Sequence, residues 1–379
     1  MNDINAWKIN SNLDVTYEIV FSENIFNKDN PAIANYGNKG DSVKRLLVLD
    51  KNISELYFEQ IKKYFDENNI YTKYLIIDGG EENKNLENLF KILETIEQFG
   101  ISRRNEPVIG IGGGVILDLV GFACSIYRRG IPYIRIPTTL LGLVDVSVAA
   151  KTGINYLSRR NRLGSYFPPL SNILDTSFLK SLEEIELISG LGEILKMAVI
   201  KDKILFELIE NNGSELLEKK FQNTPANEVI SRSVEGMKTS LENNLWEKNL
   251  KRDVDFGHSF SPIIEMRSLN DPKIILTHGQ AVALDVLFSS CISFKRGLIA
   301  KESLIRIFKT AKNMKLPIFH ISFNDKLLLW ESLCDTIKHR NGKQNLPVPA
   351  PIGSCKFIND FTFEELDEVI EKFNLYGKS

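Results

Sequence analysis

The sequence PVIGIGGGVILD, residues 107–118, decides the fold of the N-terminal half of the chain. A short apolar run leads into consecutive glycines, and the apolar pattern then continues at helical spacing, which is typical of a strand, a tight turn and a helix. Glycines at such a turn let a pyrophosphate approach backbone N–H groups at the positive end of the helix. The GxGxxG fingerprint is not satisfied, because its third glycine would fall on Val115 counted from Gly110, or on Leu117 counted from Gly112. Alone, the stretch fits a dinucleotide site or a tight structural turn.

The segments on both sides of this stretch repeat the same alternation. Amphipathic patterns predict helices, and short apolar runs predict strands. The expected strands are 45–50, 74–77, 107–112 and 133–137, and the expected helices are 54–68, 85–99 and 115–127. Strands that alternate with helices indicate a parallel, doubly wound sheet, so the expected class is α/β with a Rossmann-like domain.

Polar or glycine-rich segments follow three of these strands. Asp50 and Asn52 lie at the end of the first, DGGEENK (78–84) follows the second, and the glycine run follows the third. The carboxyl ends of parallel strands meet at one edge of the sheet, where such sheets bind ligands. We therefore expect a dinucleotide at this edge. The candidate residues are Asp50, Asn52, Glu81, Lys84, Gly113, Gly114 and Asp118.

The second half of the chain has a different character, because long helical periodicities dominate it after about residue 182. They run over 183–200, 204–220, 226–247, 280–296 and 300–314. A chain of 379 residues is long enough for two domains. We expect an α/β domain over 1–182 that binds the dinucleotide, and a mainly helical domain over 183–379 that carries the metal and substrate sites.

Charge and cysteine content exclude several classes of partner. Lys and Arg number 47 against 49 Asp and Glu, a net charge of −2, so no overall basic field attracts nucleic acid or a membrane surface. The four cysteines are scattered without a CxxC pair, which is typical of a reducing compartment. The first residues contain no apolar segment, and no apolar run reaches the length of a membrane span. We expect a cytoplasmic protein with no nucleic-acid or membrane partner.

Three residues suggest a metal site. His258 in FGHSF (256–260) and His278 in THGQ (277–280) each lie beside a glycine at an expected helix start, and Glu193 lies in the apolar segment SGLGEILK (189–196). A lone histidine of this kind is more often structural, but a buried glutamate needs a partner. Two imidazoles and one carboxylate would leave coordination positions open, as catalytic zinc requires. Lys196, three residues after Glu193, would share its helix face.

A third cluster lies between the sheet and the helices. Asp145, Lys151 and Asn161 occur in a stretch interrupted by glycines, residues 137–164. An acid, a lysine and an amide suit a polyol phosphate, although solvated loop residues would look similar. Both interpretations remain open on these residues alone.

Together these segments resemble the sugar-phosphate cyclase superfamily, whose best-known member is 3-dehydroquinate synthase. The similarity extends from about residue 46 to 346. It rests on GGG (112–114) with Asp118, YRRG (127–130), PTT (137–139) with Asp145 and Lys151, Glu193 with Lys196, and the two glycine-flanked histidines. The resemblance implies that the glycines, Thr138 and Thr139 hold NAD. It also implies that Glu193, His258 and His278 bind Zn²⁺, with Co²⁺ as an alternative.

The resemblance further implies which residues handle the substrate. The expected catalytic groups are Asp145, Lys196, Lys238, Asp255 and His339. The expected contacts with substrate or phosphate are Arg129, Lys151, Asn161, Leu241, Lys251 and Lys338. In the family the counterpart of Arg129 reaches the phosphate across a dimer interface, which implies a homodimer.

Departures from 3-dehydroquinate synthase narrow the substrate. That enzyme has a second histidine at the position of Pro262, asparagine at that of Asp255 and usually glutamate at that of Gln280. The segments 256–262 and 161–166 resemble the branch that cyclises sedoheptulose 7-phosphate. Within it, Leu241, Asp255 and His339 resemble the set of the 2-epi-5-epi-valiolone synthases, which serve C7-cyclitol biosynthesis.

The implied reaction is a cyclisation that releases phosphate. It combines transient oxidation, β-elimination, re-reduction and an intramolecular aldol addition, with NAD regenerated in each turnover. Three alternatives remain: another cyclase specificity (2-epi-valiolone, desmethyl-4-deoxygadusol or 3-dehydroquinate), a polyol oxidoreductase of the glycerol dehydrogenase type, and a non-catalytic homologue.

Overall fold

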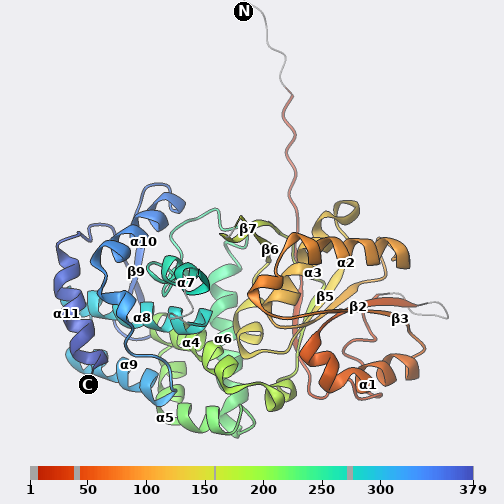
Figure 1. Ribbon diagram of the computed structural model, residues 1–379, viewed down its shortest axis with the longest axis horizontal. Coiled ribbons are helices and arrows are strands. Elements are labelled where there is room, and N and C mark those ends of the chain that lie inside the picture. Colours follow the sequence, from red (N-terminus) through yellow and green to blue (C-terminus); the bar gives the residue numbers. More distant parts are fainter. Residues whose placement is uncertain (1–6, 38–42, 158, 271–275, 379) are drawn as a thin grey trace, which may run out of the picture.

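The computed structural model describes residues 7–37, 43–157, 159–270 and 276–378. Its N-terminal half contains a six-stranded parallel sheet, and its C-terminal half is mainly helical (Figure 1). This arrangement confirms the predicted fold class. The strand order is β1-β8-β5-β4-β2-β3, with β1 Glu18–Phe21, β8 Ser171–Leu174, β5 Tyr133–Pro137, β4 Val108–Gly112, β2 Lys44–Asp50 and β3 Tyr71–Ile77.

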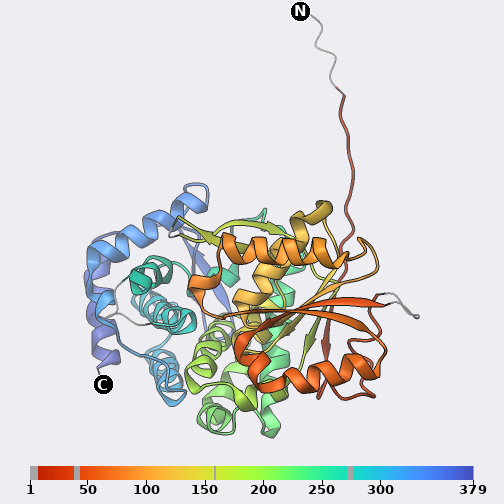
Figure 2. The ribbon, with the colours of Figure 1, turned by 45° about the vertical axis from the view of Figure 1, so that its right-hand side comes forward.

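The two faces of the sheet bury alternate residues of the same strands. Leu47 and Leu49 of β2 face the helix α1 (Lys51–Glu67), whereas Leu46 and Val48 face the other side. That other side is covered by α2 (Leu86–Phe99) and α3 (Gly114–Ile126), as Figure 2 shows. Because both faces are covered, the central strands are mostly apolar, which made them recognisable in the sequence. The exception in β5 is Arg135, which is buried and donates to the carbonyls of Val146, Ala149 and Lys151.

The predicted strands and helices of this half are all present, with ends shifted by up to three residues. Three features were not predicted: the short edge strand β1, its short neighbour β8, and a separate antiparallel hairpin. The hairpin consists of β6 (Lys151–Tyr156) and β7 (Arg159–Tyr166), and it packs beside α3. Residues 151–156 and 159–164, interpreted from the sequence as parts of a glycine-interrupted stretch, therefore lie in two paired strands.

In the helical half, α4 (Glu184–Ile200) and α8 (His278–Lys295) pack against each other at the centre. Every residue of α4 from Leu187 onward is buried, as expected for a helix that is apolar on all sides. The crossing is very close: a Cβ on Gly192 would lie 2.0 Å from the carbonyl oxygen of Gly279. Around this pair lie α5 Lys203–Glu218, α6 Thr224–Leu241, α7 Ser261–Asn270, α9 Lys301–Asn313, α10 Lys326–His339, α11 Glu365–Gly377 and the hairpin of β9 Leu346–Pro349 and β10 Cys355–Ile358.

One helix prediction was wrong at its C-terminal end. The helix expected over 226–247 ends at Leu241, and an irregular segment follows it. The Asn244 side chain accepts from the backbone N–H of Asn249 and donates to its carbonyl, 3.0 and 2.8 Å apart. Such side-chain bonds to the backbone compete with helical ones. The segment 242–252 is therefore not helical, and it contains Glu247, Lys251 and Arg252.

Two expectations concern the chain as a whole. The domain boundary near residue 182 stays a prediction; it falls between the last sheet strand, which ends at Leu174, and α4, which begins at Glu184. No helix among the described residues is both long and apolar enough to cross a membrane. The first six residues, on which part of the cytoplasmic expectation rests, lie outside the described ranges.

Candidate active site

Three side chains from separate segments converge at the junction of the two halves. Glu193 projects from α4, His278 is the first residue of α8, and His258 lies just before α7. One carboxylate oxygen and two ring nitrogens lie within 4.8 Å of one another. The Nε2 atoms of His278 and His258 lie 3.1 and 3.6 Å from the same Glu193 oxygen. The structure thus brings together the three residues expected to bind the metal.

Both imidazoles have a partner on the opposite ring nitrogen. Nδ1 of His278 lies 3.0 Å from a Glu265 carboxylate oxygen, and Nδ1 of His258 lies 3.2 Å from the Phe256 carbonyl. Such partners orient metal-ligating histidines and leave Nε2 for the ion. The donor set therefore fits Zn²⁺, which favours imidazole nitrogen and carboxylate oxygen. Sequence reasoning missed Glu265, although an acidic residue in the apolar segment SPIIEM was a signal.

The pKa values of the site residues reflect burial and neighbouring charge. Burial lowers the pKa of His258 to about 4. Burial also opposes charge on His278, but the Glu265 and Glu193 carboxylates outweigh it and raise its pKa to about 10. Burial acts to raise the pKa of Glu265, but His278 and Arg160 outweigh this effect and lower the pKa to about 2. A divalent cation would thus replace a proton on His278.

Lys196 and Asp145 lie beside the metal trio. Lys196 forms an ion pair with the second oxygen of Glu193, and both side chains are only 2% exposed. Burial lowers the pKa of Lys196, but Glu193 and Asp145 outweigh it and raise the pKa above its usual value. Burial and the Glu193 charge raise the pKa of Asp145, against the effect of Lys196. A carboxyl group and an ammonium group next to a metal site can move protons on a bound alcohol.

The residues expected to hold NAD gather at the carboxyl edge of the sheet. Asp50 caps α1 by accepting from the Asn52 N–H at 2.9 Å, and its side chain lies against Gly79 and Gly112. Burial raises the pKa of Asp50. The turn beyond β4 places Gly113 and Gly114 at the start of α3. Thr138, whose N–H donates to the Gly112 carbonyl at 3.0 Å, and Thr139 follow β5 on the same edge.

Lys84 and Glu81 connect this edge with the β6–β7 hairpin. The Lys84 ammonium lies 2.6 Å from Asp118 and 2.6 Å from the Asn161 amide oxygen. Glu81 forms a bidentate pair with Arg160, at 2.8 and 2.9 Å. Arg160 also binds Glu265, so one guanidinium joins the predicted cofactor edge to the predicted metal site. Nothing in the sequence near Arg160 indicated this role.

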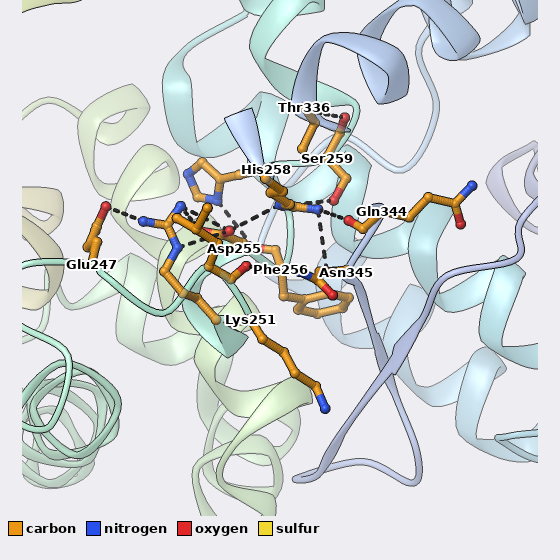
Figure 3. A network of polar contacts seen from close by, with 12 residues as sticks. Glu247, Lys251, Asp255, Phe256, His258, Ser259, Thr336, Gln344 and Asn345 are labelled. Carbon is orange, nitrogen blue, oxygen red and sulfur yellow. Dashed lines mark hydrogen bonds and ion pairs between the residues drawn. The ribbon is translucent and has the colours of Figure 1, made fainter. Parts of the chain in front are cut away.

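Lys151 lies at one end of a second network of charges, and Figure 3 draws the part of it from Glu247 to Asp255 and beyond. The Lys151 ammonium lies 2.7 Å from Glu247, which also binds Arg252 and accepts from the Tyr166 hydroxyl at 3.1 Å. Burial raises the pKa of Glu247, but Lys151 and Arg252 outweigh it and lower the pKa below its usual value. Beyond Arg252 the network continues to Asp255. The sequence identified Lys151 and Asp255 but not the groups between them.

The structure does not gather the remaining candidates in the same way. The described contacts of Lys238, Lys251 and His339 are with Glu235, the ring of Phe357 and Asp335. His339 is 67% exposed. Lys338 and Arg129 are exposed as well, and Leu241 is buried at the end of α6. Their expected roles in binding or catalysis stay predictions.

Comparisons with known proteins agree with this geometry. The family models "3-dehydroquinate synthase N-terminal" and "3-dehydroquinate synthase C-terminal" match residues 74–189 and 190–339. A 2-epi-5-epi-valiolone synthase from an Actinomyces species is 39% identical over 98% of this chain and 99% of its own. A 3-dehydroquinate synthase from Prochlorococcus marinus (strain AS9601) is 32% identical over 92% and 94%.

A solved structure covers the same length. It is the 2-epi-5-epi-valiolone synthase from Streptomyces hygroscopicus subsp. jinggangensis 5008 with NAD⁺ and Zn²⁺ bound, 39% identical, with a TM-score of 0.92 over 97% of this chain and 99% of that one. Both family models together span most of the chain, and the sequence relatives span nearly all of it. The chain belongs to the 3-dehydroquinate synthase family of sugar-phosphate cyclases.

Proposed function

We propose that this protein cyclises sedoheptulose 7-phosphate to 2-epi-5-epi-valiolone with release of phosphate, as a carbon–oxygen lyase that uses NAD and Zn²⁺. One observation carries the proposal. Asp255 and Pro262 flank His258 of the Glu193–His258–His278 cluster. The chain that carries them is 39% identical, over 97% of its length, to a 2-epi-5-epi-valiolone synthase solved with NAD⁺ and Zn²⁺ bound. Asparagine and histidine would be expected at those two positions in 3-dehydroquinate synthase.

The cofactors have defined places in this proposal. Glu193, His258 and His278 hold Zn²⁺, and the carboxyl edge of β2, β3, β4 and β5 holds NAD through Asp50, Asn52, Glu81, Lys84, Gly113, Gly114, Asp118, Thr138 and Thr139. When bound, the metal acidifies a coordinated hydroxyl and the dinucleotide exchanges a hydride with the substrate. Co²⁺ could replace Zn²⁺, since the donor set suits both ions.

The chain's own groups bind and orient the substrate. Lys196 and Asp145, which lie beside the metal trio, are proposed to move the protons of the reacting hydroxyls. Lys151, Asn161 and Lys338 grip the phosphate, with Arg129 of a second subunit as a bidentate clamp. Lys238, Leu241 and Lys251 are proposed to contact the substrate, and Asp255 and His339 to orient hydroxyls near the forming ring. The protein is thus proposed to act as a homodimer, and in the cytoplasm, in agreement with its four free cysteines.

Product analysis tests the proposal. Purified protein is incubated with sedoheptulose 7-phosphate, NAD and Zn²⁺, and phosphate release and the NMR spectrum of the product are recorded. We expect 2-epi-5-epi-valiolone with one phosphate per turnover and no net NADH. Glu193→Ala should be inactive, and Glu302→Ala, an exposed acid on α9, should behave as wild type.

The alternatives give different results in the same assay. Another cyclase specificity would give 2-epi-valiolone, desmethyl-4-deoxygadusol or, from a heptulosonate phosphate, 3-dehydroquinate. A polyol oxidoreductase would accumulate stoichiometric NADH without phosphate. Failure to release phosphate from any of these sugar phosphates would support a non-catalytic homologue.

A further inference from the structure

The Asp255 carboxylate is held by two arginines from different parts of the chain. Arg252, three residues earlier, contacts one oxygen at 2.8 Å and the other at 3.0 and 3.1 Å. Arg340, at the C-terminal end of α10, contacts the second oxygen at 3.3 Å. In Figure 3, Asp255 lies at the centre of this network, between Glu247 and Asn345. Its orientation is therefore set from two sides.

Arg340 is an anchored group in its own right. Its side chain is 3% exposed. Besides Asp255, it donates to the Gln344 carbonyl at 2.8 Å and the Ser259 hydroxyl at 3.5 Å. A buried guanidinium without an anionic partner is strongly unfavourable, so Arg340 and Asp255 depend on each other. Arg340 also fixes the end of α10, where Lys338 and His339 lie, against the segment that carries His258.

Arg252 links Asp255 to the predicted phosphate-binding side. It binds Glu247, which in turn pairs with Lys151 at 2.7 Å. Positive and negative side chains therefore alternate along a series of five linked residues: Lys151, Glu247, Arg252, Asp255 and Arg340. A shift of one member would move its neighbours, because each charge is satisfied by the next.

We propose that Arg252 and Arg340 are positioning residues that determine substrate class, by fixing the Asp255 carboxylate as a hydrogen-bond acceptor for substrate hydroxyls. This inference rests on the proposed function and deepens it. A carboxylate can only accept hydrogen bonds, so the ligand group that faces it must be a donor, such as a hydroxyl, rather than another carboxylate. The preference for a hydroxyl over a carboxylate at this position then depends on three residues together: Arg252, Asp255 and Arg340.

The contrast with asparagine follows from the same geometry. An amide at residue 255 would leave the buried Arg340 without its described carboxylate contact, whereas Arg252 would keep Glu247. The NH₂ group of the amide would also compete for the same space as the arginine donors. Asp255→Asn alone is therefore expected to disturb the site rather than convert it to one that accepts a carboxylate.

A double-mutant cycle tests this inference with the full-length protein, NAD and Zn²⁺. Three single variants are made: Arg340→Met, Arg252→Gln and Asp255→Asn. They are compared with the two double variants that combine Asp255→Asn with each arginine substitution, and kcat and KM for sedoheptulose 7-phosphate are measured. Misplacement of a substrate-orienting group costs on the order of 100-fold. Each single variant should lose about 10- to 100-fold in kcat/KM, and each double variant should be no worse than its poorer parent. Arg340→Lys should recover part of the loss.

Controls separate the possible failures. Arg267→Met removes a half-exposed arginine on α7 and should retain wild-type kinetics. If wild type does not turn over sedoheptulose 7-phosphate, the proposed function fails. If wild type is active but the arginine variants match it, or their effects add to that of Asp255→Asn, the positioning role is overturned. If Arg340→Met does not fold, the cycle of Arg252→Gln with Asp255→Asn decides alone, since Arg252 is less buried than Arg340.

Discussion

Glu265 and His278 form a close carboxylate–imidazole contact, with 3.0 Å between a Glu265 oxygen and Nδ1 of the ring. The contact joins α7 to the first turn of α8, and it directs Nε2 of His278 toward Glu193, 3.1 Å away. Arg160 binds the same Glu265 oxygen. The orientation of one proposed metal ligand is thus determined by a residue that does not touch the metal position itself.

Removing this carboxylate should weaken metal binding. In Glu265→Ala the His278 ring loses its oriented partner, and loss of such partners typically lowers metal affinity about 10- to 100-fold. Competition with a chelator at fixed pH would measure the Zn²⁺ dissociation constant. Glu302→Ala is the control, because its side chain is exposed on α9. An unchanged dissociation constant in Glu265→Ala would show that the contact does not support the metal.

The strands that could be predicted are those whose own residues form a recognisable apolar pattern. Strands β2, β4 and β5 are buried on both faces and are therefore largely apolar, although β5 also contains the buried Arg135. The strand β8, SNIL, is as deeply buried but only four residues long, and it becomes a strand through pairing with β1 and β5. No pattern within those four residues distinguishes them from a loop.

The same distinction applies to the site. Glu193, His258 and His278 were recognisable because each lies beside glycine in a conspicuous segment. Arg160, Arg252 and Arg340 were missed, because they are single charged residues whose roles depend on partners. Arg160 binds Glu265, and Arg340 binds Asp255, across separations of 105 and 85 residues. Only the folded chain brings such pairs together.

Acid should remove a defined part of the stability of the metal-free protein. The folded-state pKa of Glu265 is about 2, below its ordinary 4.5, because His278 and Arg160 outweigh the effect of burial. A depressed carboxyl pKa stabilises the fold above pH 4.5, and this contribution is lost as the pH falls toward 2. Gln resembles the protonated carboxyl group. The stability difference between wild type and Glu265→Gln should therefore shrink by about 1 kcal/mol between pH 5.5 and 3.5.

Urea unfolding of chelator-treated protein at the two pH values measures this difference. Both proteins lose stability from other carboxyl groups on acidification, so only the difference between them is informative. A difference that stays constant with pH would mean that Glu265 titrates alike in the folded and unfolded chains.

The crossing of α4 and α8 should not tolerate a methyl group. A Cβ on Gly192 would lie 2.0 Å from the Gly279 carbonyl oxygen, which is backbone and cannot rotate away. Gly192→Ala should destabilise the protein by at least about 1–3 kcal/mol, the usual cost of overpacking. Because Glu193 and His278 lie next to this contact, the variant should also retain less Zn²⁺. Urea denaturation and metal content measure the two effects.

Gly236→Ala provides the matched control, since a Cβ on this helical glycine of α6 would meet two flexible side chains, the end of Met197 at 3.0 Å and Lys201 at 3.7 Å. The substitution removes backbone entropy from the unfolded chain and should change stability by less than about 1 kcal/mol. Similar unfolding midpoints for the Gly192 and Gly236 variants would show that the helices can separate without cost.

A histidine at residue 262 should not create 3-dehydroquinate synthase activity. Pro262 is exposed in the first turn of α7, so Pro262→His adds an imidazole near His258 without displacing a buried group. The Asp255 carboxylate remains between its two arginines, so a substrate carboxylate still lacks a complete binding site. The variant should show no turnover of a heptulosonate 7-phosphate above wild type, measured as phosphate release. Pro262→Ala controls for loss of the proline, and robust turnover by the histidine variant alone would show that residue 262, rather than the Asp255 network, selects the substrate.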